Sequence, residues 1–221
     1  MAGSGMQIGA LVRSYGLTNY LDAVLDSYDW VDKVVVMNHR FKDVKETKDD
    51  TALLTAPHKN AILIKGEGLN QHEVFNEGLK EFEGFDCVFI ADNDELIQRA
   101  DQDRIVKGLE GHDAVTCRVL DYARSYDFIF PIRGHHPITA VKPYAKFHDV
   151  RCSSCRHKVM SDIYIHHFGY VYTPEELTWK LDWEKPWEHS SVIDILSHVP
   201  QRYEMPEEIK EMLGDRNTKI I

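Results

Sequence analysis

Short apolar runs alternate with amphipathic segments over the first half of the chain. Four runs have the length and composition of buried strands, and they span residues 6–12, 31–37, 61–65 and 86–91. One helix is predicted to begin at a Thr18 cap, and another at Asn70, where Glu73 completes a capping box. Strands that alternate with helices favour an α/β fold with a mainly parallel sheet flanked by helices, and such sheets bind ligands beyond the carboxyl ends of their strands.

The pattern changes after Gly111. Strand-like segments follow with few helix signals between them, at residues 114–120, 127–132, 144–148 and 163–167. This region is therefore predicted to be small and more antiparallel. A helix signal returns at Thr173, with Pro174 at the first helical position and Glu176 three residues after the cap. The tail is predicted to form short amphipathic helices that Pro200 and Pro206 interrupt.

These elements predict a single domain over residues 6–185, which is large enough to be a catalytic domain. Its first half, residues 6–111, would bind the main ligand, and residues 112–172 would form the second half. Residues 186–221 would be a C-terminal helical extension. Residues 1–5 have the composition of an expression scar, since they carry neither the basic start nor the apolar run of a signal peptide.

Composition and charge restrict the function classes. The net charge of −10 disfavours a nucleic-acid partner, because a long polyanion would be repelled. The apolar stretches all fall short of the roughly 18 residues that a membrane-spanning helix needs, which predicts a protein without a transmembrane segment. Cys87 and Cys117 lie inside apolar runs and favour a reduced, cytoplasmic setting.

The fourth apolar run ends abruptly in the acidic sequence Asp92-Asn93-Asp94-Glu95. Carboxylates that crowd at a sheet edge repel one another unless a counter-charge is present. A hard cation such as Mn²⁺ or Mg²⁺ would supply that charge and keep open positions for phosphate oxygens. The other interpretation is a solvated acidic turn before a helix, where acids are favoured anyway.

An apolar strand followed by this acidic sequence resembles the DxD element of the GT-A fold, and particularly of family 2 glycosyltransferases. A second similarity is the run from Tyr164 to Tyr172, which contains His166, His167 and Gly169 and precedes a helix that bears Lys180. A third is the helix of residues 70–79, although Phe75 stands where the family has arginine. The resemblance covers residues 6 to about 180.

The resemblance implies a nucleotide-diphosphate sugar as donor, with a UDP-sugar as the first choice. Residues 6–111 would then be the half that binds the nucleotide sugar, and residues 112–172 would be the acceptor half. Asp94, and Asp92 directly or through water, would hold the cation with His167, and His166 is the alternate ligand. Only one of the two histidines can face the ion, because successive side chains of a strand point to opposite faces. The residues expected around the donor are Arg13, Tyr15, Asn38, Asn76, Asp92, Asn93 and Lys180.

The resemblance also suggests an inverting displacement, in which a carboxylate accepts the proton of the acceptor hydroxyl. Asp149 is the first candidate for this base, and Asp121 and Asp162 are the others. Asn38 stands in a run that departs from the family's Asp-x-x-Ser-x-Asp, so the nucleotide base stays open. The acceptor also stays open, with a glycan, lipid, protein or modified base as alternatives.

Four other functions compete with sugar transfer. A Gly66-x-Gly68 turn suggests a dinucleotide site but lacks the third glycine and the expected position in the first strand–helix unit. Cys152 and Cys155 form a single CxxC, whereas a structural zinc site normally needs four ligands. A nucleotidyltransferase would share the acidic metal site, and a non-catalytic sugar-nucleotide binder would bind without turnover.

Overall fold

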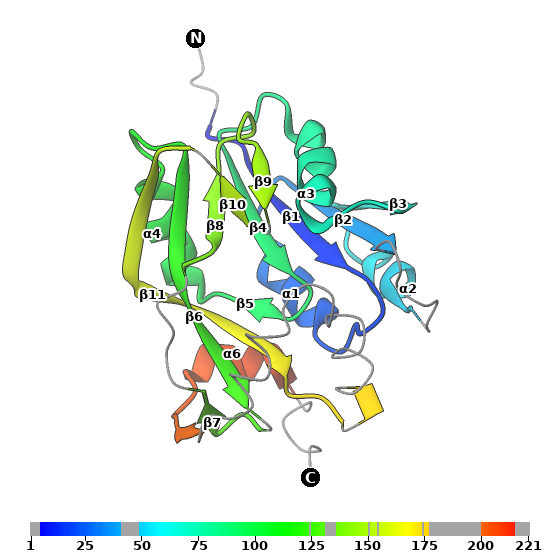
Figure 1. Cartoon of the computed structure of the whole chain (residues 1–221), viewed down its shortest axis with the longest axis vertical. Helices are drawn as coiled ribbons and strands as arrows, with labels where there is room; N and C mark the ends of the chain where they lie inside the picture. Colours follow the sequence, from blue (N-terminus) through cyan, green and yellow to red (C-terminus); the bar gives the residue numbers. More distant parts are fainter. Residues whose placement is uncertain are drawn as a thin grey trace.

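The chain folds around one large mixed sheet, seen in a computed structural model (Figure 1). The structure describes residues 5–40, 49–123, 125–130, 136–149, 151–153, 155–173, 175–176 and 200–214. The strand order is β12-β7-β6-β8-β4-β1-β2-β3, and β11 adds to it by pairing with β5 and β6. This is the mainly parallel α/β sheet that the sequence predicts for the first half of the chain.

Four parallel strands form the first half of the sheet. They are β1 (Ile8–Ser14), β2 (Lys33–Arg40), β3 (Ala61–Glu67) and β4 (Cys87–Asp92). In their register, Arg13 of β1 lies opposite Asp92 of β4, and Ser14 lies opposite Asn38 of β2. The carboxyl ends of β1, β2 and β4 therefore meet at one edge of the sheet.

Helices cover both faces of these strands (Figure 1). Ala10 and Val12 pack in one buried cluster with α1 (Leu21–Ser27), whereas Leu11 and Met37 pack in another with α3 (Gln71–Leu79). The alternation of neighbouring β1 residues between two cores explains why the strands are apolar throughout. Shorter helical elements are α2 (Thr51–Thr55), η1 (Lys80–Phe82) and α4 (Arg99–Gly108).

The second half adds antiparallel pairs and one long strand. β8 (Ile138–Val141) runs antiparallel to both β4 and β6 (Ala114–Ala123). β11 (His157–Tyr170) runs parallel to β6 and antiparallel to the short β5 (Glu95–Leu96). The remaining elements are β7 (Phe128–Ile129), β9 (Phe147–Asp149), β10 (Cys152–Ser153), β12 (Gln201–Arg202) and α6 (Glu207–Leu213).

Two predicted helix starts are confirmed, and one is wrong. Asn70 and Glu73 form a capping box at α3. At the other start, the Thr173 N–H donates to the Glu176 carboxylate, and the Glu176 N–H donates to the Thr173 hydroxyl oxygen. The helix predicted at Thr18 begins instead at Leu21, because Thr18 contributes only its carbonyl oxygen to a turn with the Leu21 N–H. Lys180 lies outside the described residues, as does most of the extension predicted from residue 186.

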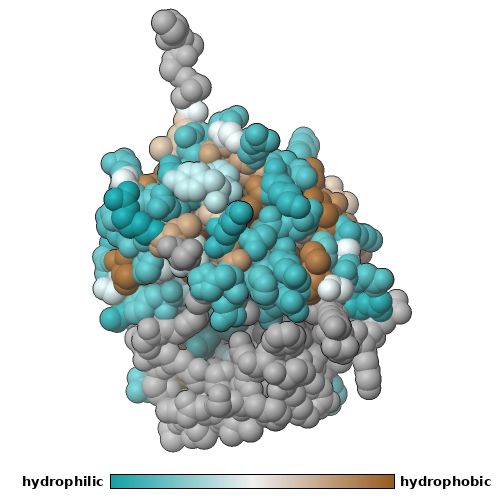
Figure 2. All heavy atoms as spheres, turned by 45° about the horizontal axis from the view of Figure 1, so that its top comes forward, coloured by the Kyte–Doolittle hydropathy of each residue, from teal (hydrophilic) through white to brown (hydrophobic). Residues whose placement is uncertain are grey.

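The surface mixes hydrophilic and apolar side chains. Figure 2 shows apolar groups lying among hydrophilic ones on the face that holds the start of the chain. The large exposed apolar side chains come from separate elements, for example Leu53 on α2, Tyr144 after β8 and Val159 on β11. In the part of the chain that the structure describes, no helix is both long and apolar enough to span a membrane.

Candidate active site

The acidic sequence after β4 lies at the carboxyl edge of the parallel strands, as predicted. The ion pair between Arg13 and Asp92 joins β1 to β4, with 2.8 Å between Nε and Oδ1. The Arg13 guanidinium also lies over the Phe75 ring of α3, 5.2 Å from its centroid. Arg13 is therefore held at the strand ends by both a carboxylate and an aromatic face.

Arg151 supplies a second positive charge to the same cluster. Its side chain is only 4% exposed and pairs with both carboxylate oxygens of Glu95, and its Nη1 lies 3.9 Å from Asp92 Oδ2. It also donates hydrogen bonds to the carbonyl oxygens of Ile90 and Ile138. Burial raises the pKa of Glu95, and the ion pair with Arg151 opposes that shift.

Arg13 and Arg151 change the explanation of the acidic cluster. Two guanidinium groups already balance the charges of Asp92 and Glu95, so these carboxylates do not by themselves require a cation. The sequence did not predict that Arg151 belongs to the site. It lies in the turn between β9 and β10 with a left-handed φ of 49°, and no pattern in the sequence marks that turn.

Asp94 faces His167 across the edge of the sheet. Its side chain is almost fully buried, and His167 Nε2 lies 3.6 Å from its Oδ1. The Phe168 N–H donates to the Asp94 carbonyl oxygen, and the Tyr172 hydroxyl lies 3.4 Å from Oδ2. Asp94 and His167 are 73 positions apart in the sequence, and the pairing of β11 with β5 brings them together.

The other nitrogen of His167 contacts Asp121 of β6, with 2.6 Å between Nδ1 and Oδ1. In the neutral ring a hydrogen bond donated from Nδ1 leaves the lone pair on Nε2, the atom that faces Asp94. Nε2 and Asp94 Oδ1 can each lie at a metal–ligand distance of about 2.0–2.3 Å from one shared ion. The residues present therefore fit a divalent cation held by Asp94 and His167.

His166 lies on the opposite face of β11, inside the core. Its Nδ1 is 2.9 Å from the Tyr122 hydroxyl, and its ring stacks on that of Tyr122. Burial lowers the pKa of His166 to about 4, so the ring is neutral near pH 7. The two neighbouring histidines thus face different environments, and His167 is the one beside Asp94.

A polar network lies next to the acidic cluster. Asn93 Nδ2 donates to the Leu17 carbonyl oxygen at 2.5 Å and to Ser14 Oγ at 3.3 Å. Asn38 Nδ2 donates to Asp49 Oδ2 at 2.6 Å, and Asp49 accepts the hydroxyl of Thr51, which in turn contacts Ser14. Two predicted donor-binding residues, Asn38 and Asn93, are thus connected through residues that the sequence did not mark.

The other predicted residues lie in different surroundings. Tyr15 follows β1 and is half-buried. Asn76 connects α3 to β9 through hydrogen bonds with both backbone groups of Phe147. Asp149 is exposed on β9, and Asp162 is exposed on β11, where it pairs with Arg104. These two candidate bases are therefore at the surface, whereas Asp121 contacts His167.

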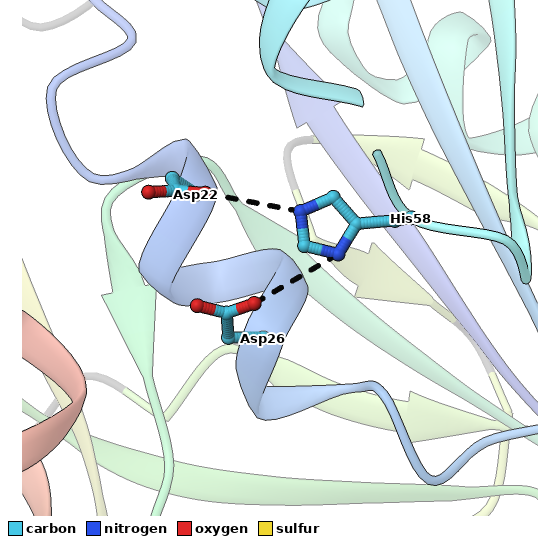
Figure 3. Close-up of side chains that lie close together, drawn as sticks. All are labelled: Asp22, Asp26 and His58. Atoms are coloured by element: carbon cyan, nitrogen blue, oxygen red, sulfur yellow. Dashed lines mark ion pairs between the residues drawn. The ribbon is translucent and has the colours of Figure 1, made fainter. Parts of the chain in front are cut away.

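A separate group of possible metal ligands lies between α1 and the turn before β3. Among the described residues, Asp22, Asp26 and His58 are the one set of three such side chains whose ligand atoms lie within 4.8 Å of one another. Figure 3 shows the His58 ring between the two carboxylates, with Nε2 3.8 Å from Asp22 and Nδ1 3.9 Å from Asp26. Each ring nitrogen faces a different carboxylate, which suits an ion pair between α1 and the turn before β3.

Comparisons with known proteins identify the fold. No family model and no curated protein matches the sequence. The solved mannosyltransferase PcManGT from Pyrobaculum calidifontis, in complex with GDP-Man and Mn²⁺, has a TM-score of 0.55 at 16% identity, covering 96% of this chain and 69% of that chain. Residues 1–349 of S. aureus TarS in complex with UDP-GlcNAc have a TM-score of 0.52 at 14% identity, and the match covers 74% of this chain and 59% of that chain.

This chain matches less than two thirds of that TarS fragment. In a further complex, of TarS with UDP, the match gives a TM-score of 0.51 at 13% identity and covers 94% of this chain and 70% of that chain. At such identities the likeness establishes architecture, while activity depends on the site. The chain has the GT-A fold, the architecture that it shares with these nucleotide-sugar glycosyltransferases.

Proposed function

We propose that this protein is a glycosyltransferase that moves a sugar from a nucleotide-diphosphate sugar to an acceptor hydroxyl, with the help of Mn²⁺ or Mg²⁺. The observation that supports it most is the pair of Asp94 and His167, which face each other 3.6 Å apart at the carboxyl edge of a GT-A sheet. Ligands of such sheets bind at that edge. The complexes of the structural neighbours with UDP-GlcNAc and with GDP-Man and Mn²⁺ support the same donor class.

Each part of the site has a role in this proposal. Asp94 and His167 would hold the ion, and Asp92, which is paired with Arg13, would assist directly or through water. When bound, the ion supplies Lewis-acid stabilisation of the charge that builds on the departing diphosphate. Arg13 meets a phosphate oxygen at the same edge, because a guanidinium binds phosphate with directed hydrogen bonds.

The nucleoside is proposed to lie beside the network of Asn38, Asp49 and Asn93. These side chains present amide and carboxylate groups next to the strand ends, where a base and a ribose need hydrogen-bond partners. UDP is the preferred nucleotide, with GDP as the second choice. Tyr15 and Lys180 stay in the proposal as donor contacts, and Asp149, Asp121 and Asp162 stay as candidate bases for an inverting reaction.

The cellular setting is part of the same proposal. Cys87 and Cys117 are free and buried, and burial raises the pKa of each thiol to about 12. Such thiols behave as small apolar side chains and need no oxidising environment. This supports a cytoplasmic enzyme that meets its nucleotide sugar where such donors are made.

A thermal-shift panel tests the proposal. UDP-, GDP-, CDP- and dTDP-sugars are each added with Mn²⁺ or with EDTA, and the Tm is recorded. A donor at 100 times its Kd stabilises the fold by about 2.7 kcal/mol, which is roughly 5–10 °C for a domain of this size. We expect one nucleotide to give such a shift with Mn²⁺ only. An equal shift in EDTA, or no shift with any donor, contradicts the proposal.

Product analysis then separates the competing enzyme class. A glycosyltransferase releases a nucleoside diphosphate when the donor turns over in the presence of an acceptor or of water. A nucleotidyltransferase instead exchanges the α-phosphate and releases pyrophosphate from a nucleoside triphosphate. We expect nucleoside diphosphate as the product, and pyrophosphate release would favour the nucleotidyltransferase.

A further inference from the structure

The Asp121 carboxylate contacts the His167 ring on the nitrogen that points away from Asp94. We propose that Asp121 is a positioning residue, which holds the Nδ1–H of His167 so that Nε2 faces Asp94 before any ion arrives. The proposal rests on the proposed function, since it assigns His167 to the ion site. It replaces the role of proton acceptor that the sequence suggests for Asp121.

The strand register places this contact. His167 of β11 is paired with Asp121 of β6, and the next residue back, His166, is paired with Leu120. The register between β11 and β6 shifts after His167, so the pair of His167 and Asp121 is the last regular pair before that shift. Backbone pairing at this position fixes the two Cα atoms side by side, which keeps both side chains on the same face of the sheet.

The same two strands hold the neighbouring histidine in a contrasting way. Tyr122 and His166 meet on the core face, with 2.9 Å between the hydroxyl and Nδ1. Asp121 and His167 meet on the site face, with 2.6 Å between their polar atoms. A neutral hydroxyl therefore holds the buried ring, whereas a carboxylate holds the ring that faces Asp94. A carboxylate on the far nitrogen fixes the tautomer and strengthens a histidine as a metal ligand.

The charges around the site support this assignment. Asp92 and Glu95 are paired with Arg13 and Arg151, which leaves Asp94 and Asp121 as the carboxylates on either side of the His167 ring. Asp121 Oδ1 lies 2.6 Å from His167 Nδ1, and a carboxylate oxygen at this distance accepts the imidazole N–H when Nδ1 carries the proton. That contact suits an orienting group more than a base, which must accept the proton of an acceptor hydroxyl.

The first test reads the tautomer of His167 without any metal. Two-bond ¹⁵N–¹H correlation NMR at pH 8.5 reports which ring nitrogen carries the proton, and the His167→Gln spectrum assigns the signals. We expect the Nδ1–H form in the unaltered protein and a shift toward the Nε2–H form in Asp121→Asn and Asp121→Ala. An identical tautomer in all three proteins overturns the proposal.

The second test measures Mn²⁺ affinity by calorimetry in the presence of UDP or GDP, whichever the panel selects. Loss of an outer partner of a metal-bound histidine weakens metal binding about 10–100-fold, and we expect that loss in Asp121→Asn. The matched control is Asp103→Asn, because Asp103 is an exposed aspartate that pairs with Arg99, and the Mn²⁺ affinity of this variant should change less than twofold.

Turnover separates positioning from proton transfer. If Asp121 acts through His167, then a high Mn²⁺ concentration restores donor turnover in Asp121→Asn. An unchanged Mn²⁺ affinity with a kcat that added Mn²⁺ does not restore overturns the proposal and makes Asp121 or His167 the base. Failure of the unaltered protein to bind Mn²⁺ overturns the proposed metal-dependent function together with this inference, whereas equal binding by all variants overturns the inference alone.

Discussion

Arg151 shows at the scale of single residues why an acidic sequence is a weak guide to a metal site. Crowded carboxylates do need a counter-charge, but at Asp92 and Glu95 two arginines supply it. The proposed cation would then lie between Asp94 and His167. A sequence argument that counts acidic residues cannot distinguish these cases, because the arginines come from residues 13 and 151.

Arg151→Met tests the importance of this buried ion pair. Removing one partner leaves the Glu95 carboxylate buried without its counter-charge, and such losses cost about 3–5 kcal/mol. Urea unfolding measures the change in the free energy of unfolding. The control is Arg104→Met, because solvent screens the exposed Arg104–Asp162 pair and its loss should therefore cost much less. Similar small losses in both variants would show that Arg151 is not needed to neutralise Glu95.

His39 gives a pH dependence of stability. Its ring is buried at the end of β2, and Nδ1 has no hydrogen-bond partner among the described residues. Burial lowers the pKa of His39, and Glu77 opposes that shift. The unfolded chain, with a histidine pKa of about 6.5, therefore binds more protons as the pH falls, and stability is lost in that direction.

The expected result is a free energy of unfolding that falls between pH 7.5 and pH 5.5, with a smaller fall in His39→Leu. The same measurement on a variant of an exposed histidine, His148→Gln, provides the control. If His39→Leu loses as much stability over this range as the unaltered protein does, then His39 does not carry the effect.

Some residues of the site can be predicted from the sequence around them, and others cannot. Asp92 and Asn38 lie near the carboxyl ends of buried strands, and Asp94 follows one of them. The carboxyl ends of parallel strands meet at one edge, so the sequence predicts where these residues lie. Strand alternation predicts only that one of His166 and His167 faces the site, and the choice of His167 comes from the resemblance to the family. Glu95, Arg151 and Asp49 could not be predicted, because their contacts depend on turns and on register between distant segments.

At the scale of elements, local signals predict the first half better than the second. Apolar runs and capping boxes predict β1 to β4 and α3, since each signal lies within the element itself. β11 extends over 14 residues although only residues 163–167 are predicted, because its first part is mostly exposed and carries no apolar alternation. β5 and β7 have two residues each, and only pairing with distant strands defines them.

Gly78 explains how closely α3 approaches the sheet. A Cβ at this position would lie 2.4 Å from Leu11 Cδ1 and 3.0 Å from Met37 Cγ. Alanine gains about 1 kcal/mol of helix propensity over glycine, but overpacking a core costs about 1–3 kcal/mol. We therefore expect Gly78→Ala to destabilise the protein in urea unfolding, although the same change stabilises an isolated helix.

A second substitution makes this prediction specific. In the double variant Leu11→Val with Gly78→Ala, the shorter side chain makes room for the new methyl group. The two changes should then cost less together than the sum of their separate costs, as a double-mutant cycle measures. Additive costs, or a stabilising Gly78→Ala, would show that α3 has room to move away from β1.

At the scale of the whole molecule, the fold and the charge have separate consequences. The chain keeps the architecture of PcManGT at 16% identity, because buried periodic positions and not particular residues determine the sheet. Its net charge of −10 should repel a diphosphate at long range. Local positive charge must then overcome this repulsion at the strand ends, and Arg13 with the proposed ion supplies it there.

Calorimetric titration with the nucleoside diphosphate tests the central claim most directly. The unaltered protein, Asp94→Asn and the surface control Asp103→Asn are each titrated in Mn²⁺ and in EDTA. We expect the unaltered protein and Asp103→Asn to bind in Mn²⁺ and to lose about 100-fold or more in affinity in EDTA, a loss of roughly 2.7 kcal/mol. Asp94→Asn should bind weakly under both conditions. If all three proteins bind the nucleotide equally well with and without Mn²⁺, then Asp94 and His167 do not hold a cation against the diphosphate.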